Sequence, residues 1–122
     1  MTDKKILVVD DEEAIRNLFK AALMQKKYTV FCAESGEEAL EILDMESIPV
    51  MFLDINLPGM NGMDLCKKIL EKTPGTIAYA VTGHTSNRKS AECKEAGFQD
   101  YFSKPIPIQT LFDAAQDAFN RL

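Results

Sequence analysis

The chain has 122 residues, of which 46% are hydrophobic and 27% are charged, and this size and balance indicate one globular domain. A domain of this size buries about two-thirds of the surface that its unfolded chain exposes, so it needs no disulfide or structural metal to fold. The net charge of −5 argues against binding to nucleic acid or to an anionic membrane, because both reward clustered Lys and Arg.

The cysteines and the N-terminus indicate a cellular compartment. Cys32, Cys66 and Cys93 are odd in number and far apart, and their spacing is not that of a zinc site, so we interpret them as free thiols in a reducing environment. The N-terminal residues lead into only four apolar residues, which is too short for a signal peptide. Every apolar stretch is far shorter than the about 20 residues of a membrane helix. We therefore expect a cytoplasmic protein.

The first half of the chain alternates short apolar runs with longer amphipathic stretches. Ile6–Val9 is continuously apolar and predicts a strand. Apolar residues then recur at helical spacing, and they are Ile15, Leu18, Phe19, Ala22 and Leu23. Tyr28–Ala33 is a weaker strand candidate. Ser35 and Glu38 fit a capping box that opens a second helix, and Val50–Leu53 is the next continuously apolar run.

The second half continues this alternation. A third helix, ended by Thr73–Gly75, is marked by Leu65, Ile69 and Leu70. The apolar run Ile77–Val81 predicts a strand, Ser86–Ala96 a helix with Gly97 at its C-terminal cap, and Gln99–Ser103 a weaker strand. The last helix begins after Pro107 and carries one apolar stripe, formed by Ile108, Leu111, Phe112, Ala115, Phe119 and Leu122.

Five strands that alternate with five helices imply a doubly wound α/β sandwich. Runs that are apolar on both faces suit central strands of a parallel sheet covered by helices on both sides. Right-handed crossovers leave few topologies for such a chain. We expect a flavodoxin-like (βα)5 fold with a parallel five-stranded sheet in the order 2-1-3-4-5.

Polar residues directly follow four of the predicted strands. They are Asp10, Asp11 and Glu12 after the first strand, Asp54 after the third, Thr82 after the fourth and Lys104 after the fifth. In such sheets, ligands bind outside the carboxyl ends of the strands, near the point where the strand order reverses. Because the first and third strands are neighbours in this order, we expect Asp10, Asp11 and Asp54 to converge.

Three convergent carboxylates repel one another, so either one is protonated or a cation lies among them. Hard oxygen ligands suit Mg²⁺, with Mn²⁺ as a substitute. With the ammonium group of Lys104 and the hydroxyl of Thr82, they make a site for a phosphoryl group, and Asp54 would be the nucleophile that forms an aspartyl-phosphate. Taken singly, each residue also fits an ordinary turn or helix cap. The joint pattern at four strand ends favours the phosphoryl site.

Four segments carry a resemblance to a known family. They are Ile6–Glu12, Asp54–Gly62, Ala80–Gly83 and Asp100–Pro105. Together and in this order they resemble the receiver domain of the two-component response regulators, and the resemblance covers essentially the whole chain. It implies a single receiver domain over residues 1–122 with no output domain.

The resemblance assigns roles around the acidic residues. It implies that Asp54 is the phosphoacceptor, and that Asp11 and Asp54 bind Mg²⁺ directly together with the backbone carbonyl of Asn56. Asp10 would act mainly through a water molecule on the metal. The phosphoryl group would come from a histidine of a partner kinase or phosphotransfer protein, and the chain would itself catalyse no more than its own phosphorylation and dephosphorylation.

The resemblance also assigns a switch. It implies that Lys104 bonds a phosphoryl oxygen, that the Lys104–Pro105 peptide is cis, and that Thr82 moves toward the phosphoryl group. Tyr101 matches an aromatic residue that turns inward in the active state, although an exposed tyrosine at the sheet edge is the alternative. The fourth helix, fifth strand and fifth helix would then form the face that a downstream protein recognises.

Two further assignments stay open. His84, two residues after Thr82, would influence the attack of water on the phosphoaspartate, or is an ordinary loop histidine. By resemblance, Ala14 and Ile15 with the loop at Pro105 would be the docking site for the phosphodonor, or these apolar residues belong to the core.

Three other functions compete with this interpretation. Phosphohydrolases of the haloacid dehalogenase group carry a second acid two residues after the nucleophile, where this chain has Asn56. A flavodoxin-type cofactor binder needs a phosphate loop rich in Ser, Thr and Gly after the first strand, where this chain has acidic residues that repel phosphate. A degenerate receiver that acts as an interaction module without phosphorylation conflicts with the complete set of pocket residues.

Overall fold

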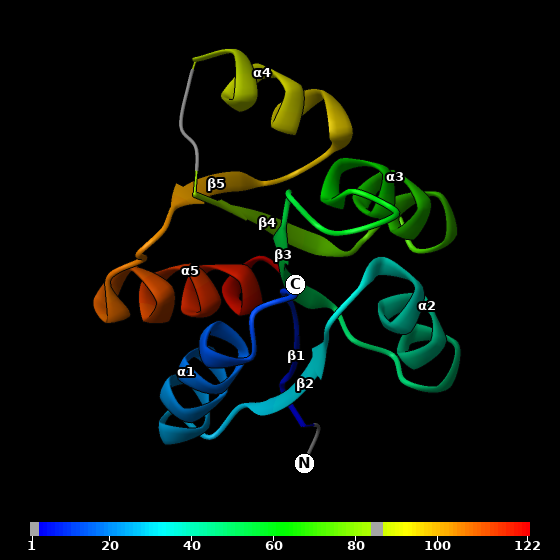
Figure 1. The fold of residues 1–122 in the computed structure, drawn as a ribbon. Coiled ribbons are helices and arrows are strands. Elements are labelled where there is room, and N and C mark those ends of the chain that lie inside the picture. Colours follow the sequence, from blue (N-terminus) through cyan, green and yellow to red (C-terminus); the bar gives the residue numbers. More distant parts are fainter. Residues whose placement is uncertain (1–2, 84–86) are drawn as a thin grey trace.

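The computed structural model of the protein describes residues 3–83 and 87–122. Over this range strands and helices alternate strictly (Figure 1). The strands are β1 (Lys5–Val9), β2 (Thr29–Ala33), β3 (Val50–Asp54), β4 (Ile77–Thr82) and β5 (Asp100–Ser103). The helices are α1 (Glu13–Gln25), α2 (Gly36–Met45), α3 (Gly62–Lys72), α4 (Asn87–Ala96) and α5 (Ile108–Arg121).

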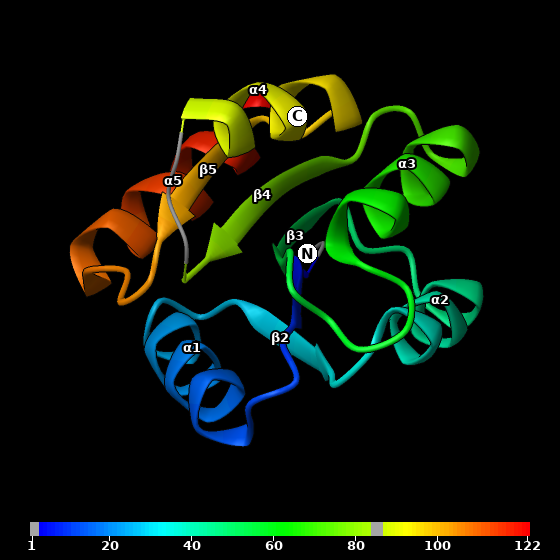
Figure 2. The same ribbon diagram turned by 45° about the horizontal axis from the view of Figure 1, so that its top comes forward.

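All neighbouring strands are parallel, and their order in the sheet is β2-β1-β3-β4-β5. This confirms the flavodoxin-like topology predicted from the sequence. Helices α1 and α5 cover one face of the sheet, and α2, α3 and α4 cover the other (Figures 1 and 2). The carboxyl ends of β1, β3, β4 and β5 therefore lie side by side. This row of strand ends forms the edge of the sheet at which the predicted site residues are expected.

The alternation of side chains along each strand supplies both hydrophobic layers. In β1, Leu7 points into the layer shared with α2, α3 and α4, whereas Ile6 points into the layer shared with α1 and α5. Phe52 of β3 stacks on Tyr79 of β4 with ring centroids 5.2 Å apart. The Tyr79 hydroxyl donates a hydrogen bond to the Ala114 carbonyl at 3.1 Å, which satisfies its buried polar atom. Burial on both faces explains why the central strands are continuously apolar.

The predicted element boundaries differ from the structure by about one residue. Asp54 and Thr82 are the last residues of their strands and not the first residues after them, because the parallel ladder still pairs Asp54 with Val81 and Thr82 with Ser103. The second strand begins at Thr29, one residue later than predicted, because the Tyr28 amide still bonds to the Leu23 carbonyl in the last turn of α1. These shifts leave the polar residues at the same edge of the sheet.

The predicted helix caps are present with one change of partner. The Ser35 hydroxyl accepts a hydrogen bond from the Glu38 amide at 3.1 Å, as a capping box requires. The Glu38 carboxylate, however, accepts from the Glu34 amide at 3.3 Å. Gly97 follows α4 with φ +104°, in the left-handed region that glycine enters without steric cost. Over the described part of the chain, the helices are too short or too polar to span a membrane.

Candidate functional site

Asp10 anchors the loop between β1 and α1. Its amide donates to the Ala33 carbonyl at 3.1 Å, and its side-chain Oδ1 accepts from the Glu12 amide at 2.9 Å. The guanidinium group of Arg16 donates to the Asp10 carbonyl at 2.8 Å. With only 2% of its surface exposed, Asp10 is a buried carboxylate on a loop whose backbone is held from three sides.

Asp54 ends β3 and is also buried, with 4% of its surface exposed. Its Oδ1 accepts a hydrogen bond from the Asn56 amide at 3.0 Å, which fixes the carboxylate against the loop that follows. The loop closes back at Gly62, whose amide donates to the Ile55 carbonyl at 2.9 Å. A side-chain carbon on Gly62 would overlap the Asp54 carbonyl oxygen, so only glycine lets α3 start this close to the strand.

Lys104 joins the two buried carboxylates. Its Nζ lies 2.7 Å from Asp10 Oδ2 and 3.3 Å from Asp54 Oδ2. The Lys104 amide donates to the Thr82 carbonyl at 2.8 Å, which fixes the backbone from which the side chain extends. The following peptide bond, Lys104–Pro105, is cis. One ammonium group therefore lies between two carboxylates, one at the end of β3 and one directly after β1.

These contacts shift the protonation of the site. Burial raises the pKa of Asp54 above its ordinary value, and the nearby Asp10 raises it further, whereas the Asn56 amide and Lys104 oppose the rise. Burial alone would lower the pKa of Lys104, but the hydrogen bond and charge of Asp10, together with Asp54, raise it overall. Lys104 is therefore a cation at neutral pH, whereas burial makes the charged form of Asp54 less favourable than it is in water.

A cavity of about 260 Å³ opens on this edge of the sheet. It is lined by Asp11, Glu12, Asp54, Asn56, Gly83 and Lys104. Carboxylate oxygens of Asp10, Asp11 and Glu12 lie within 4.8 Å of one another. Hard, convergent oxygens beside a partly open cavity match the ligand preference of Mg²⁺, so the donor set fits this ion.

Glu12 was placed beside the site by the sequence, directly after the first strand, but was given no role in binding a metal. Its carboxylate joins the cluster because its amide is drawn back onto the Asp10 side chain, which turns the loop. Arg16, on the first turns of α1, was likewise unassigned and holds the Asp10 carbonyl. The acidic run after β1 was the available signal for Glu12, whereas helical spacing alone gives no signal for the Arg16 contact.

Other predicted residues lie at or near the same edge. Thr82 is fully buried at the end of β4, and the next residue, Gly83, lines the cavity. Tyr101 on β5 is half-buried and packs against the hydrophobic layer of α3 and α4. Ala14 is exposed and Ile15 half-buried on α1. His84 lies outside the described residues.

This chain is similar to known proteins over most of its length. The family model of the response regulator receiver domain matches residues 6–116. The chain belongs to the response regulator receiver family. The receiver domain of a CheY-like protein from Methanospirillum hungatei JF-1 superimposes with a TM-score of 0.93 at 31% identity, over 98% of this chain and 96% of that one.

Two curated relatives resemble this chain over part of their own length. Regulatory protein VanR of Enterococcus faecium is 39% identical over 112 residues, which are 91% of this chain and 48% of VanR. A cyclic di-GMP phosphodiesterase of Thermotoga maritima is 32% identical over 106 residues, which are 87% of this chain and 28% of that protein. The chain thus spans less than half the length of either relative.

Proposed function

We propose that this receiver domain is a phosphoacceptor switch in which Asp54 receives a phosphoryl group from a phosphohistidine of a partner protein. The observation that carries this proposal is the position of Lys104 Nζ, 2.7 Å from Asp10 and 3.3 Å from Asp54. The carboxylate to be phosphorylated lies beside a fixed cation and at the wall of an open cavity. Family membership supports a histidine kinase or a histidine phosphotransfer protein as the donor.

The transfer needs little covalent chemistry from the protein. An oxygen of the Asp54 carboxylate attacks phosphorus, the P–N bond to the donor imidazole breaks, and the imidazole nitrogen keeps the electron pair. Lys104 offsets the charge on the transferred phosphoryl oxygens, and the Asn56 amide holds the carboxylate in position for attack. Asp10, Asp11, Asp54 and the Asn56 carbonyl would hold Mg²⁺, which when bound neutralises charge on the phosphoryl group.

The phosphorylated state would be read elsewhere on the domain. The phosphoryl group favours one arrangement of Thr82 and its loop, and Tyr101 follows by moving further inward from its half-buried position. The α4-β5-α5 face then differs between the two states and binds an unidentified downstream protein. We propose a cytoplasmic protein that contacts neither nucleic acid nor membrane directly and that catalyses only its own phosphorylation and dephosphorylation.

The test is phosphorylation by a small donor. The protein is incubated with Mg²⁺ and acetyl phosphate, and intact mass is recorded for the wild type and for Asp54→Asn. We expect one phosphoryl adduct on the wild type that requires Mg²⁺ and is absent from the variant. An Asp64→Asn variant, which changes an exposed carboxylate on α3, should still accept phosphate. If no adduct forms at any time, the domain is a receiver-shaped interaction module.

A further inference from the structure

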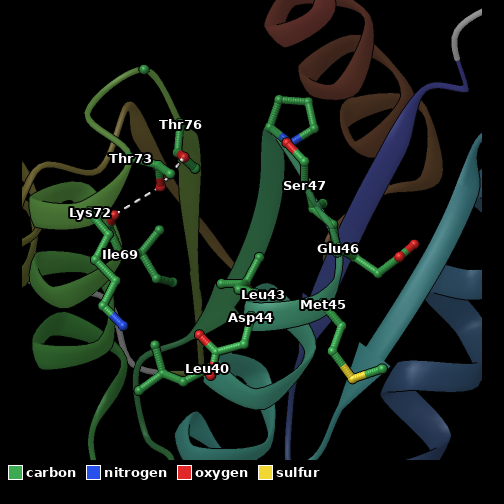
Figure 3. Close-up of a pocket in the computed structure, with 13 residues that line it drawn as sticks. Leu40, Leu43, Asp44, Met45, Glu46, Ser47, Ile69, Lys72, Thr73 and Thr76 are labelled. Atoms are coloured by element: carbon green, nitrogen blue, oxygen red, sulfur yellow. Dashed lines mark hydrogen bonds between the residues drawn. The ribbon is translucent and has the colours of Figure 1, made fainter.

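A second and larger cavity lies at the opposite ends of the strands, where β3 and β4 begin. Its volume is about 490 Å³, within the range of small-molecule sites in proteins. It opens between the C-terminal ends of α2 and α3, next to the residues that lead into β3 and β4 (Figure 3). It shares none of its lining residues with the phosphoacceptor cavity.

The cavity has an apolar floor and a polar rim. The apolar floor consists of Leu40, Leu43, Ile48 and Ile69. Ile48 and Ile69 are almost fully buried, whereas Leu40 and Leu43 keep part of their surface open. Apolar surface that stays open beneath charged side chains gives an amphipathic ligand a place for its apolar part.

The rim is unusually negative on the side of α2. The macrodipole of a helix places partial negative charge at its C-terminus, where basic residues are favourable. The last turn of α3 follows this rule with Lys72, but the last turn of α2 has no basic residue and carries Asp44. Glu46, the C-cap residue of α2, pairs with Lys5 at 3.4 Å. Within the described ranges, Asp44 itself forms no ion pair, so its carboxylate stays available to a cation in the cavity.

Lys72 lies across the cavity from this negative rim. Figure 3 shows its ammonium group on the α3 wall and the Asp44 carboxylate on the α2 wall. Among the described residues the two groups are not within ion-pair distance, and both are exposed. The α2 wall therefore offers a site for a positive charge that Lys72 does not fill.

We propose that this cavity binds a small organic amine, protonated at neutral pH, with an aromatic or alkyl body. The ammonium group lies at Asp44 and the C-terminal carbonyls of α2, which a cation stabilises. The apolar body covers the apolar floor and removes it from water. Lys72 on the opposite wall disfavours a second positive charge, so the site selects monovalent amines.

The test is an NMR titration of the full ¹⁵N-labelled chain with 2-phenylethylamine and, separately, with 3-phenylpropionate, which has a similar body and the opposite charge. We expect saturable shifts at amides around the apolar floor with the amine, at least about threefold weaker binding of the carboxylate, and little change around Asp54. Asp44→Asn should weaken binding of the amine about threefold, and Lys72→Gln should leave it unchanged or strengthen it.

Glu41→Gln is the matched control, because Glu41 is an exposed carboxylate on the same helix and lies outside the cavity lining. It changes the net charge as Asp44→Asn does, and it should leave the affinity unchanged. The proposal is overturned if the two ligands bind equally, if Asp44→Asn behaves like Glu41→Gln, or if the shifts lie elsewhere on the surface. All three changes are at exposed side chains, and the spectrum of each free variant reports whether the fold is intact.

Discussion

Replacing Lys104 by methionine is the sharpest test of how the charges at the phosphoacceptor edge are balanced. Methionine keeps much of the length and apolar stem of lysine but removes the ammonium group. The carboxylate side chains of Asp10 and Asp54 are 3% and 5% exposed, so the change leaves two buried negative charges without their shared cation. We expect a large loss of stability in the absence of divalent ions.

The distances set the size of this loss. At an effective dielectric constant of about 20, contacts of 2.7 Å and 3.3 Å correspond to about 6 and about 5 kcal/mol of attraction before desolvation is subtracted. Measured losses on breaking buried ion pairs are about 3–5 kcal/mol, because burial of the charges offsets much of the attraction. We therefore expect Lys104→Met to lower the free energy of unfolding by about 3 kcal/mol at neutral pH.

Urea denaturation followed by circular dichroism, with EDTA present, measures this difference. Lys104 lowers the pKa of Asp54, so its removal raises that pKa further and the folded variant takes up protons more readily. The loss should therefore shrink as the pH falls through the acidic range. Lys5→Met, which breaks the more exposed pair with Glu46, should cost less than about 1 kcal/mol. A loss below about 1 kcal/mol for Lys104→Met, with no dependence on pH, would refute this reasoning.

Three further predictions concern neighbouring groups. Because the pKa of Asp54 is raised in the folded state, its negative charge destabilises the fold above that pKa. Asp54→Asn should therefore be more stable than the wild type in EDTA at neutral pH. Urea denaturation repeated at decreasing pH should show this difference in the free energy of unfolding disappear. Arg16→Gln should weaken Mg²⁺ binding about tenfold, measured by the rise of Tm with Mg²⁺, because the loop carbonyl of Asp10 loses its donor. Burial raises the pKa of the Cys66 thiol to about 12. The free energy of unfolding should therefore fall between about pH 9 and 12, and it should fall less steeply in Cys66→Ala. For the same reason the native thiol should not react with thiol reagents at about pH 8.

The fold could be predicted from the sequence because the central strands are buried on both faces. Ile6–Val9 and Val50–Leu53 are continuously apolar, which only a sheet covered by helices on both sides accommodates. Once strands and helices alternate, the handedness of crossovers leaves few sheet orders. The boundaries were less accurate, because the ladder extends through polar residues such as Asp54 and Thr82, which resemble loop residues in the sequence.

The candidate site was predictable where it depends on topology and unpredictable where it depends on loop conformation. Parallel strands bring Asp10, Asp54 and Lys104 to one edge whatever the loops do. The inclusion of Glu12 and the hydrogen bond from Arg16 depend on how the loop after β1 turns, which no periodicity encodes. The cavity between α2 and α3 escaped prediction for a related reason, since it forms where two helices end and its floor residues look like ordinary core.

The two contacts of Lys104 imply that phosphorylation of Asp54 and binding of a metal ion affect each other. Lys104 is closer to Asp10, at 2.7 Å, than to Asp54, at 3.3 Å, so in this state its charge serves mainly Asp10. A phosphoryl group on Asp54 would place additional negative charge beside the same ammonium group and compete with Asp10 for it. Asp10 would then need another cation, and Mg²⁺ held with Asp11, whose carboxylate lies within 4.8 Å of that of Asp10, would supply it. We therefore expect phosphorylation and Mg²⁺ binding to strengthen each other, by the same factor in both directions.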